Sequence, residues 1–133
     1  MAVRKASMEL QVLPGAFTVC KVAGMEGVDI AAPFCFTART DGEWSLTCET
    51  ERVPPHTVAR EDGWRMLRII GTLDFSLVGI LAAVSAVLAE AKVGIFAVST
   101  YDTDYILMKA DRLSEGLDAL RRAGYTILEE WRG

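Results

Sequence analysis

The chain has 133 residues, a length that fits one domain or two very small ones. Hydrophobic residues make up 51% and charged residues 24%, with four prolines, which is typical of a compact soluble protein and excludes a disordered one. The formal net charge of -4 opposes a general attraction to nucleic acid or to anionic membrane surfaces.

The sequence has no segment that predicts export or membrane insertion. The longest apolar segment, residues 77–89, contains Gly79 and Ser85 and is shorter than the roughly 20 residues that cross a bilayer. Near the N-terminus, Glu9 and Gln11 interrupt the apolar run that a signal peptide requires. We therefore expect a cytoplasmic protein with neither nucleic acid nor a membrane as its partner.

The first half of the chain is rich in β-favouring residues. Four strands are expected, over residues 10–13, 17–22, 34–39 and 44–49. The pair Asp41 and Gly42 is a strong turn signal between the last two strands. Residues 24–32 hold two glycines and predict at most a short helical turn. Two consecutive prolines predict an extended linker over residues 52–56, so we expect residues 1–60 to form a strand-rich module.

The cysteine and histidine content predicts no metal site and no catalytic group. Cys20, Cys35 and Cys48 lie far apart, each among apolar or β-favouring residues, which is typical of buried strand cysteines. The only histidine, His56, lies in the proline-flanked linker without an evident acidic or nucleophilic neighbour. We therefore expect no cofactor and no catalytic residue.

The second half of the chain alternates strands and helices. Residues 64–70 read as a half-buried strand, and Asp74 and Ser76 are N-cap candidates for a helix over residues 77–91. Ser114 is a candidate cap for a second helix that ends at Ala123. Three further strands are expected, over residues 93–100, 105–108 and 125–128, the first two joined at a polar turn of Asp102 and Thr103.

This β-α-β-β-α-β order over residues 64–130 predicts an α+β protein of the split βαβ, or ferredoxin-like, type. Such a unit has a mostly antiparallel sheet with both helices on one face. The first helix is apolar almost all round, and its small residues, Ala82, Ala86 and Ala89 among them, form a face that suits a second element or subunit. We therefore expect a homodimer.

Residues 73–82 and 95–107 resemble the small bacterial paired-ACT proteins, which are related to the regulatory domains of aspartokinases and to the animal arginine-sensing paired-ACT proteins. The resemblance extends more weakly over the rest of the chain. It implies two ferredoxin-like ACT modules, a degenerate one over residues 1–60 and an ACT domain over residues 61–133. It also implies that a free amino acid binds at the interface between ACT units and regulates a partner protein that the sequence does not identify.

Carried over by position from this resemblance, the ligand-binding residues are Phe75, Ser76, Leu77, Val78, Gly79, Ile80, Ser99, Thr100, Tyr101 and Asp104. Backbone N–H groups at a helix start attract a carboxylate. Gly79 would let a ligand approach the backbone or would merely allow tight helix packing, and residue type favours neither. Residue type alone assigns Asp102 and Asp104 to the turn, whereas the resemblance makes Asp104 the partner of the ligand ammonium.

Two other functions stay open at this stage, a small-molecule enzyme of unrecognised type and a structural oligomerisation module without ligand. Asp102 and Asp104 with Glu129 and Glu130 lack a loop signature for a divalent cation. The two glycines within residues 24–27 have the wrong spacing for a phosphate-binding loop. The sequence therefore favours a non-catalytic regulatory protein.

Overall fold

The computed structural model describes residues 8–70 and 79–128, which group into two compact units. Unit 1 takes residues 1–14 and 65–133, and unit 2 takes residues 15–64. The sequence had instead predicted a single boundary, between residues 60 and 61. The N-cap candidates Asp74 and Ser76 lie outside the described residues.

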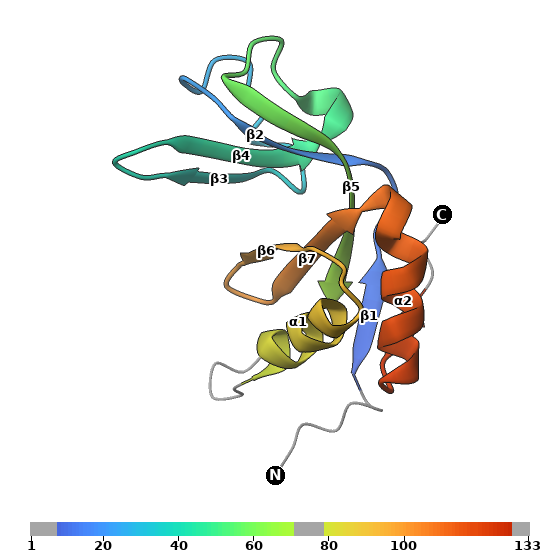
Figure 1. Ribbon diagram of the computed structural model, residues 1–133. Helices are drawn as coiled ribbons and strands as arrows, with labels where there is room; N and C mark the ends of the chain where they lie inside the picture. The colour runs from blue at the N-terminus through green and yellow to red at the C-terminus, as the bar shows by residue number, and fades with distance from the viewer. Residues whose placement is uncertain (1–7, 71–78, 129–133) are drawn as a thin grey trace. The chain divides into compact units, whose positions relative to one another are not determined.

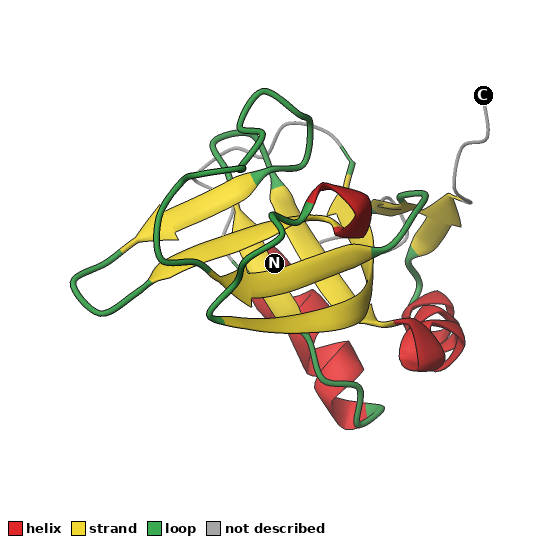
Figure 2. Ribbon diagram, turned by 90° about the horizontal axis from the view of Figure 1, so that it is seen from above, coloured by secondary structure: helices red, strands yellow, loops and turns green. Residues whose placement is uncertain are grey.

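Unit 1 contains the predicted β-α-β-β-α-β order, preceded by one more strand (Figure 1). Its elements are β1 (Glu9–Val12), the second part of β5 (Ala59–Ile69), α1 (Ile80–Glu90), β6 (Phe96–Ser99), β7 (Asp104–Lys109), the 3-10 helix η3 (Ala110–Arg112), α2 (Leu113–Arg122) and β8 (Thr126–Leu128). The strand order is β6-β7-β5-β1-β8. Both helices pack on the same face of these strands, so the prediction of a ferredoxin-like α+β fold is confirmed (Figure 2).

Strand β1 belongs to unit 1, although the sequence placed it in the N-terminal module. It lies between β5 and β8, antiparallel to β5 with Leu10 opposite Ile69 and Val12 opposite Leu67, and parallel to β8. Leu10 is 0% exposed and Val12 is 3% exposed, and both are part of the core under the two helices. The prediction was wrong because alternating apolar residues identify a strand without identifying its partner.

The helix α2 packs closely on the sheet through Gly116. A Cβ atom at this position would be 2.5 Å from the Met108 Sδ atom and 3.4 Å from Leu88 Cδ2, so only glycine fits without movement of these side chains. The helix begins at Leu113 and not after Ser114, because η3 leads directly into it. The predicted cap at Ser114 is therefore wrong.

Unit 2 is an antiparallel sheet of β2 (Phe17–Lys21), β3 (Phe36–Arg39), β4 (Trp44–Glu49) and the first part of β5, in the order β3-β4-β2-β5. A loop joins β2 to β3, and the 3-10 helix η2 (Thr50–Arg52) follows β4. These two segments occupy the positions that helices have in the β-α-β-β-α-β order. Unit 2 thus has more strand and less helix than unit 1, as the sequence predicted for the first half of the chain.

The predicted linker over residues 52–56 lies inside unit 2 and does not join the units. The residues that follow it form the first part of β5 and pair with β2, Ala59 opposite Lys21 and Trp64 opposite Phe17. The two prolines therefore end regular structure, as expected, but the chain passes between the units after Pro14 and after Trp64.

The three cysteines are free thiols in the core of unit 2. Cys20 and Cys48 are buried in β2 and β4, which confirms the prediction for these two, whereas Cys35 is half-buried and precedes β3. Burial raises the pKa of all three thiols, that of Cys48 to about 11. All three are therefore poor nucleophiles at neutral pH.

Both helices of unit 1 end with the same hydrogen-bond pattern. After α1, the N–H of Lys92 donates to Ala89 O and the N–H of Val93 donates to Leu88 O, each at 2.9 Å. In this pattern the residue after the helix has a left-handed backbone, and Lys92 has a φ of 63°. After α2 the equivalent residue is Gly124. Lys92 therefore carries a conformational cost that glycine avoids.

We expect Lys92→Gly to increase the free energy of unfolding by about 0.5–1 kcal/mol, because glycine adopts this conformation without a steric penalty. Urea denaturation of the full chain measures the change. Lys92→Ala removes the same exposed side chain but keeps the strain, and should give no increase. Equal stability of the two variants would contradict the explanation.

Candidate functional site

The β6–β7 turn holds most of the described residues that the sequence assigned to a ligand. Ser99 and Asp104 are the last paired residues of the hairpin, and the Thr100 N–H donates to Thr103 O at 2.9 Å. Tyr101 and Asp102 are the two residues at the centre of the turn. The predicted hairpin is confirmed, and Asp102 has the turn position that was expected of it.

A buried hydrogen bond fixes this turn against the end of β5. Thr103 is 6% exposed, and its hydroxyl donates to the carbonyl oxygen of Ile69 at 2.7 Å. Ile69 is the last residue of β5, the end from which the chain continues toward α1. The turn therefore lies at the carboxyl end of β5. Sequence reasoning missed this role of Thr103, since it depends on a contact between residues 34 apart in the chain.

Asp104 and Ser99 lie on the face of the sheet that carries the helices. Alternate residues of a strand share a face, and Ile106 and Met108 of β7 belong to the core beneath α1 and α2. Asp104 is half-buried and Ser99 opposite it is exposed. A carboxylate and a hydroxyl are thus paired on the helix side of the sheet, next to the turn.

Gly79 is the residue at which α1 starts. Its φ of 84° is left-handed, and its carbonyl oxygen accepts the N–H of Ala83 at 2.8 Å, the first bond of the helix. The next N–H groups of any helix start have no partner within the helix. Within the described ranges, no atom lies within 4 Å of a Cβ built on Gly79, so packing against these residues does not explain this glycine. The left-handed φ of Gly79, which favours glycine, explains it.

The other predicted ligand residues have mixed placements. Phe75, Ser76, Leu77 and Val78 lie outside the described residues. Ile80 is buried in the core of unit 1, which leaves its backbone N–H, and not its side chain, as a possible contact. Tyr101 is 81% exposed, so its ring lines a binding site only where a ligand or a partner protein covers it. In Figure 1 the start of α1 and the β6–β7 turn lie on the same side of unit 1.

Two further findings concern only the part of the chain that the structure describes. No group of three or more histidine, cysteine, aspartate or glutamate side chains in it is arranged to hold a metal ion. None of its helices has the length and apolar character needed to cross a membrane. The chemistry of the candidate site therefore rests on backbone N–H groups, hydroxyls and the Asp104 carboxylate.

We expect Thr103→Val to lower the free energy of unfolding by about 1–2 kcal/mol, because it leaves the buried Ile69 carbonyl without the Thr103 hydroxyl. Urea denaturation measures the loss. The control is Thr100→Val in the same turn, where an exposed threonine loses a 3.1 Å bond from its hydroxyl to Thr103 O. A similar loss of unfolding free energy in both variants would show that the buried hydrogen bond contributes no more than the exposed one.

Comparison with known proteins extends the structural findings. The sequence profile of the ACT domain matches residues 59–122. Protein Atu0741 from Agobacterium tumefaciens is 29% identical, with a TM-score of 0.84 over 94% of this chain and 95% of that one. VC0802 from Vibrio cholerae, described as a possible transport protein of unknown function, is 20% identical, with a TM-score of 0.69 over 90% of this chain and 91% of that one.

The regulatory subunit of aspartate kinase from Thermus thermophilus, in its ligand-free form, is 10% identical. Its TM-score is 0.61, over 86% of this chain and 95% of the subunit, which is a likeness of fold. No functionally curated protein matches the chain. The chain therefore resembles the regulatory ACT domains of aspartate kinases, and its fold is that of ferredoxin-like ACT modules.

Proposed function

We propose that this chain is a non-catalytic regulatory protein that binds a free amino acid at the carboxyl end of β5 in unit 1. The hydrogen bond from Thr103 to Ile69 O carries the proposal, because it fixes the β6–β7 turn at that end. The turn lies within residues 59–122, which match the ACT domain. The likeness to an aspartate kinase regulatory subunit supports a regulatory role.

The two ends of a free amino acid find complementary groups in this region. The carboxylate accepts hydrogen bonds from the N–H groups at the start of α1, where no atom of the described residues lies within 4 Å of a Cβ built on Gly79. The ammonium donates to Asp104, in a charge-assisted bond that is stronger than a neutral one. Ser99 adds a hydroxyl. Thr100 contributes only if its hydroxyl leaves Thr103 O.

Three parts of this proposal rest on the family resemblance. They are the position of the ligand between ACT units, the regulated partner protein, and a role for the residues that precede Gly79. Measuring the response to each of the twenty amino acids tests the ligand class directly.

The two alternative functions differ in what they need from the chain. An enzyme with a cysteine nucleophile is disfavoured, because burial keeps the pKa of Cys48 at about 11 and leaves little thiolate at neutral pH. A purely structural oligomerisation module needs no ligand at all. It therefore differs from the proposed function in one measurable property, the response to free amino acids.

The test is the melting temperature of the full chain with each of the twenty amino acids. We expect at least one to raise it, since a ligand at a hundredfold excess over its Kd stabilises the native state by about 2.7 kcal/mol. Asp104→Asn should abolish the increase while the circular dichroism spectrum stays unchanged. Asp102→Asn, a matched change in the same turn, should retain it.

Two results would count against the proposal. An unchanged melting temperature with all twenty amino acids would favour the structural module. An increase that survives in the Asp104→Asn protein would move the ligand away from the β6–β7 turn. The comparison of the two aspartate variants separates loss of the ligand contact from a general loss of charge in the turn.

We also propose a homodimer that uses the outer face of α1. Ala82, Ala86 and Ala89 are exposed along this helix, and small side chains allow close approach of another copy. Sedimentation at micromolar concentration should show a dimer, and Ala86→Arg should convert it to a folded monomer. The control Ala31→Arg, at an exposed loop position of unit 2, should stay dimeric. A monomeric native chain would refute the dimer.

A further inference from the structure

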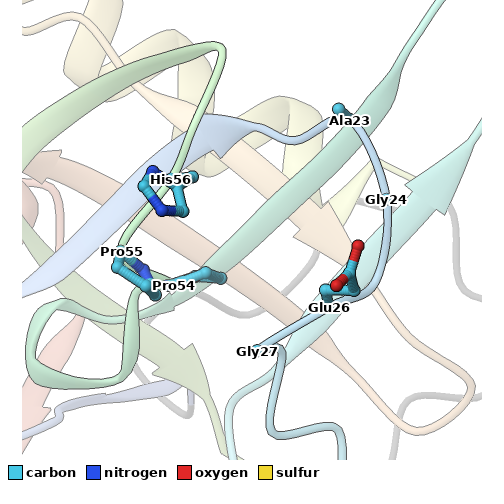
Figure 3. Close-up of a pocket in the computed structure, with 7 residues that line it drawn as sticks. All are labelled: Ala23, Gly24, Glu26, Gly27, Pro54, Pro55 and His56. Atoms are coloured by element: carbon cyan, nitrogen blue, oxygen red, sulfur yellow. The ribbon is translucent and has the colours of Figure 1, made fainter.

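Unit 2 contains a solvent-open cavity of about 300 Å³ between the loop that follows β2 and the segment that precedes β5. Figure 3 shows the residues that line it, which are Ala23, Gly24, Glu26, Gly27, Pro54, Pro55 and His56. Both segments lie where unit 2 has a loop and η2 in place of helices. The cavity therefore lies where this module has no full helices.

Two contacts connect the two walls of the cavity, one an exposed ion pair and the other a backbone hydrogen bond. On one side, the Arg52 guanidinium forms an ion pair with the Asp29 carboxylate at 2.9 Å. On the other, the Val58 N–H donates to Lys21 O at 2.7 Å. Each bond joins the loop side to the proline side of the cavity. The walls are thus connected before any ligand binds.

Gly27 brings the backbone of the loop against the proline wall. Its φ is 78°, and a Cβ atom there would lie 3.4 Å from the Pro54 Cβ atom. The N–H of Val28 donates to Met25 O at 3.1 Å and closes the turn that contains Glu26. Glu26 therefore lies within a hydrogen-bonded turn.

Two lining residues carry ionisable side chains, and they come from opposite walls (Figure 3). Glu26 supplies a carboxylate from the loop, and His56 supplies an imidazole from the segment after the prolines. The remaining lining residues are glycine, alanine and proline. A carboxylate accepts from a cation, and an imidazole N–H donates to an anion in either charge state of the ring.

We infer that this cavity is a second binding site, for a small zwitterion of amino-acid size. The ammonium of the ligand donates to Glu26, its carboxylate accepts from His56, and its apolar part contacts Pro54 and Pro55. The volume is at the lower limit of small-molecule pockets, which fits an amino acid better than a nucleotide. This site lies wholly in unit 2 and does not depend on the proposed site in unit 1.

Proton NMR tests the inference, because His56 is the only histidine of the chain and its imidazole protons give one set of signals. The full chain is titrated with each of the twenty amino acids, with acetate, and with methylammonium. We expect a saturable shift of the His56 signal with at least one amino acid below about 10 mM, and no saturation with either single-charge probe over this range. Glu26→Gln should weaken the binding at least tenfold.

The controls separate this site from a general charge effect and from the site in unit 1. Glu43→Gln removes an exposed carboxylate from a different turn of unit 2 and should leave the titration unchanged. Asp104→Asn should also leave the His56 titration unchanged. No saturable shift with any amino acid, equal affinity in the Glu26→Gln protein, or saturation by acetate alone would overturn the inference.

Discussion

The pairing of β1 with the second part of β5 is the constraint on which unit 1 depends. Leu10 and Ile69 face each other across this pair and are both 0% exposed beneath the helices. Burial of each such side chain is worth about 1.5–3 kcal/mol. The same pairing fixes the position of the Ile69 carbonyl, which receives the Thr103 hydroxyl. The location of the candidate site thus depends on a strand from the start of the chain.

The opposite face of this pair is held by polar groups. Arg68 donates to the Gln11 side-chain oxygen at 3.0 Å, across 57 residues of sequence. These two residues are direct neighbours in the β1–β5 register. Apolar burial on one face and a side-chain hydrogen bond on the other therefore specify the same register. A shift of the pairing by one residue would disrupt both interactions.

Local patterns in the sequence were sufficient for most individual elements. The Asp41–Gly42 signal, for example, marks a turn in which the Thr40 hydroxyl accepts the N–H groups of Gly42 and Glu43, at 3.2 and 3.1 Å. These hydrogen bonds join residues within a span of four, so the residues that interact in this turn are also close in sequence. The partner of β1 and the bond from Thr103 to Ile69 depend on distant residues, and no local pattern contains them.

Unit 2 shows how a sheet is covered when its helices are lost. Cys20, Val22, Leu46 and Cys48 form the buried cluster, and partly buried Val28, Cys35, Trp44 and Val53 pack against it. Val28, Cys35 and Val53, which lie in the segments between the strands, thus cover part of the sheet where helix faces would otherwise pack. The sequence predicted the missing helices from the glycines and prolines. It did not predict that the segments replacing them line a solvent-open cavity, because this depends on how far apart the two segments lie.

Gly79 and Gly27 show why the candidate sites were only partly predictable. Both have a left-handed φ, 78° at Gly27 and 84° at Gly79, so residue type and φ do not distinguish the two. A Cβ on Gly27 would contact the proline wall of the cavity, whereas one on Gly79 meets no atom of the described residues within 4 Å. Both positions favour glycine through their left-handed φ, and among the described residues only Gly27 lies where an added side chain would touch the opposite segment. A sequence gives the residue without its neighbours in space, and these neighbours decide which role a glycine has.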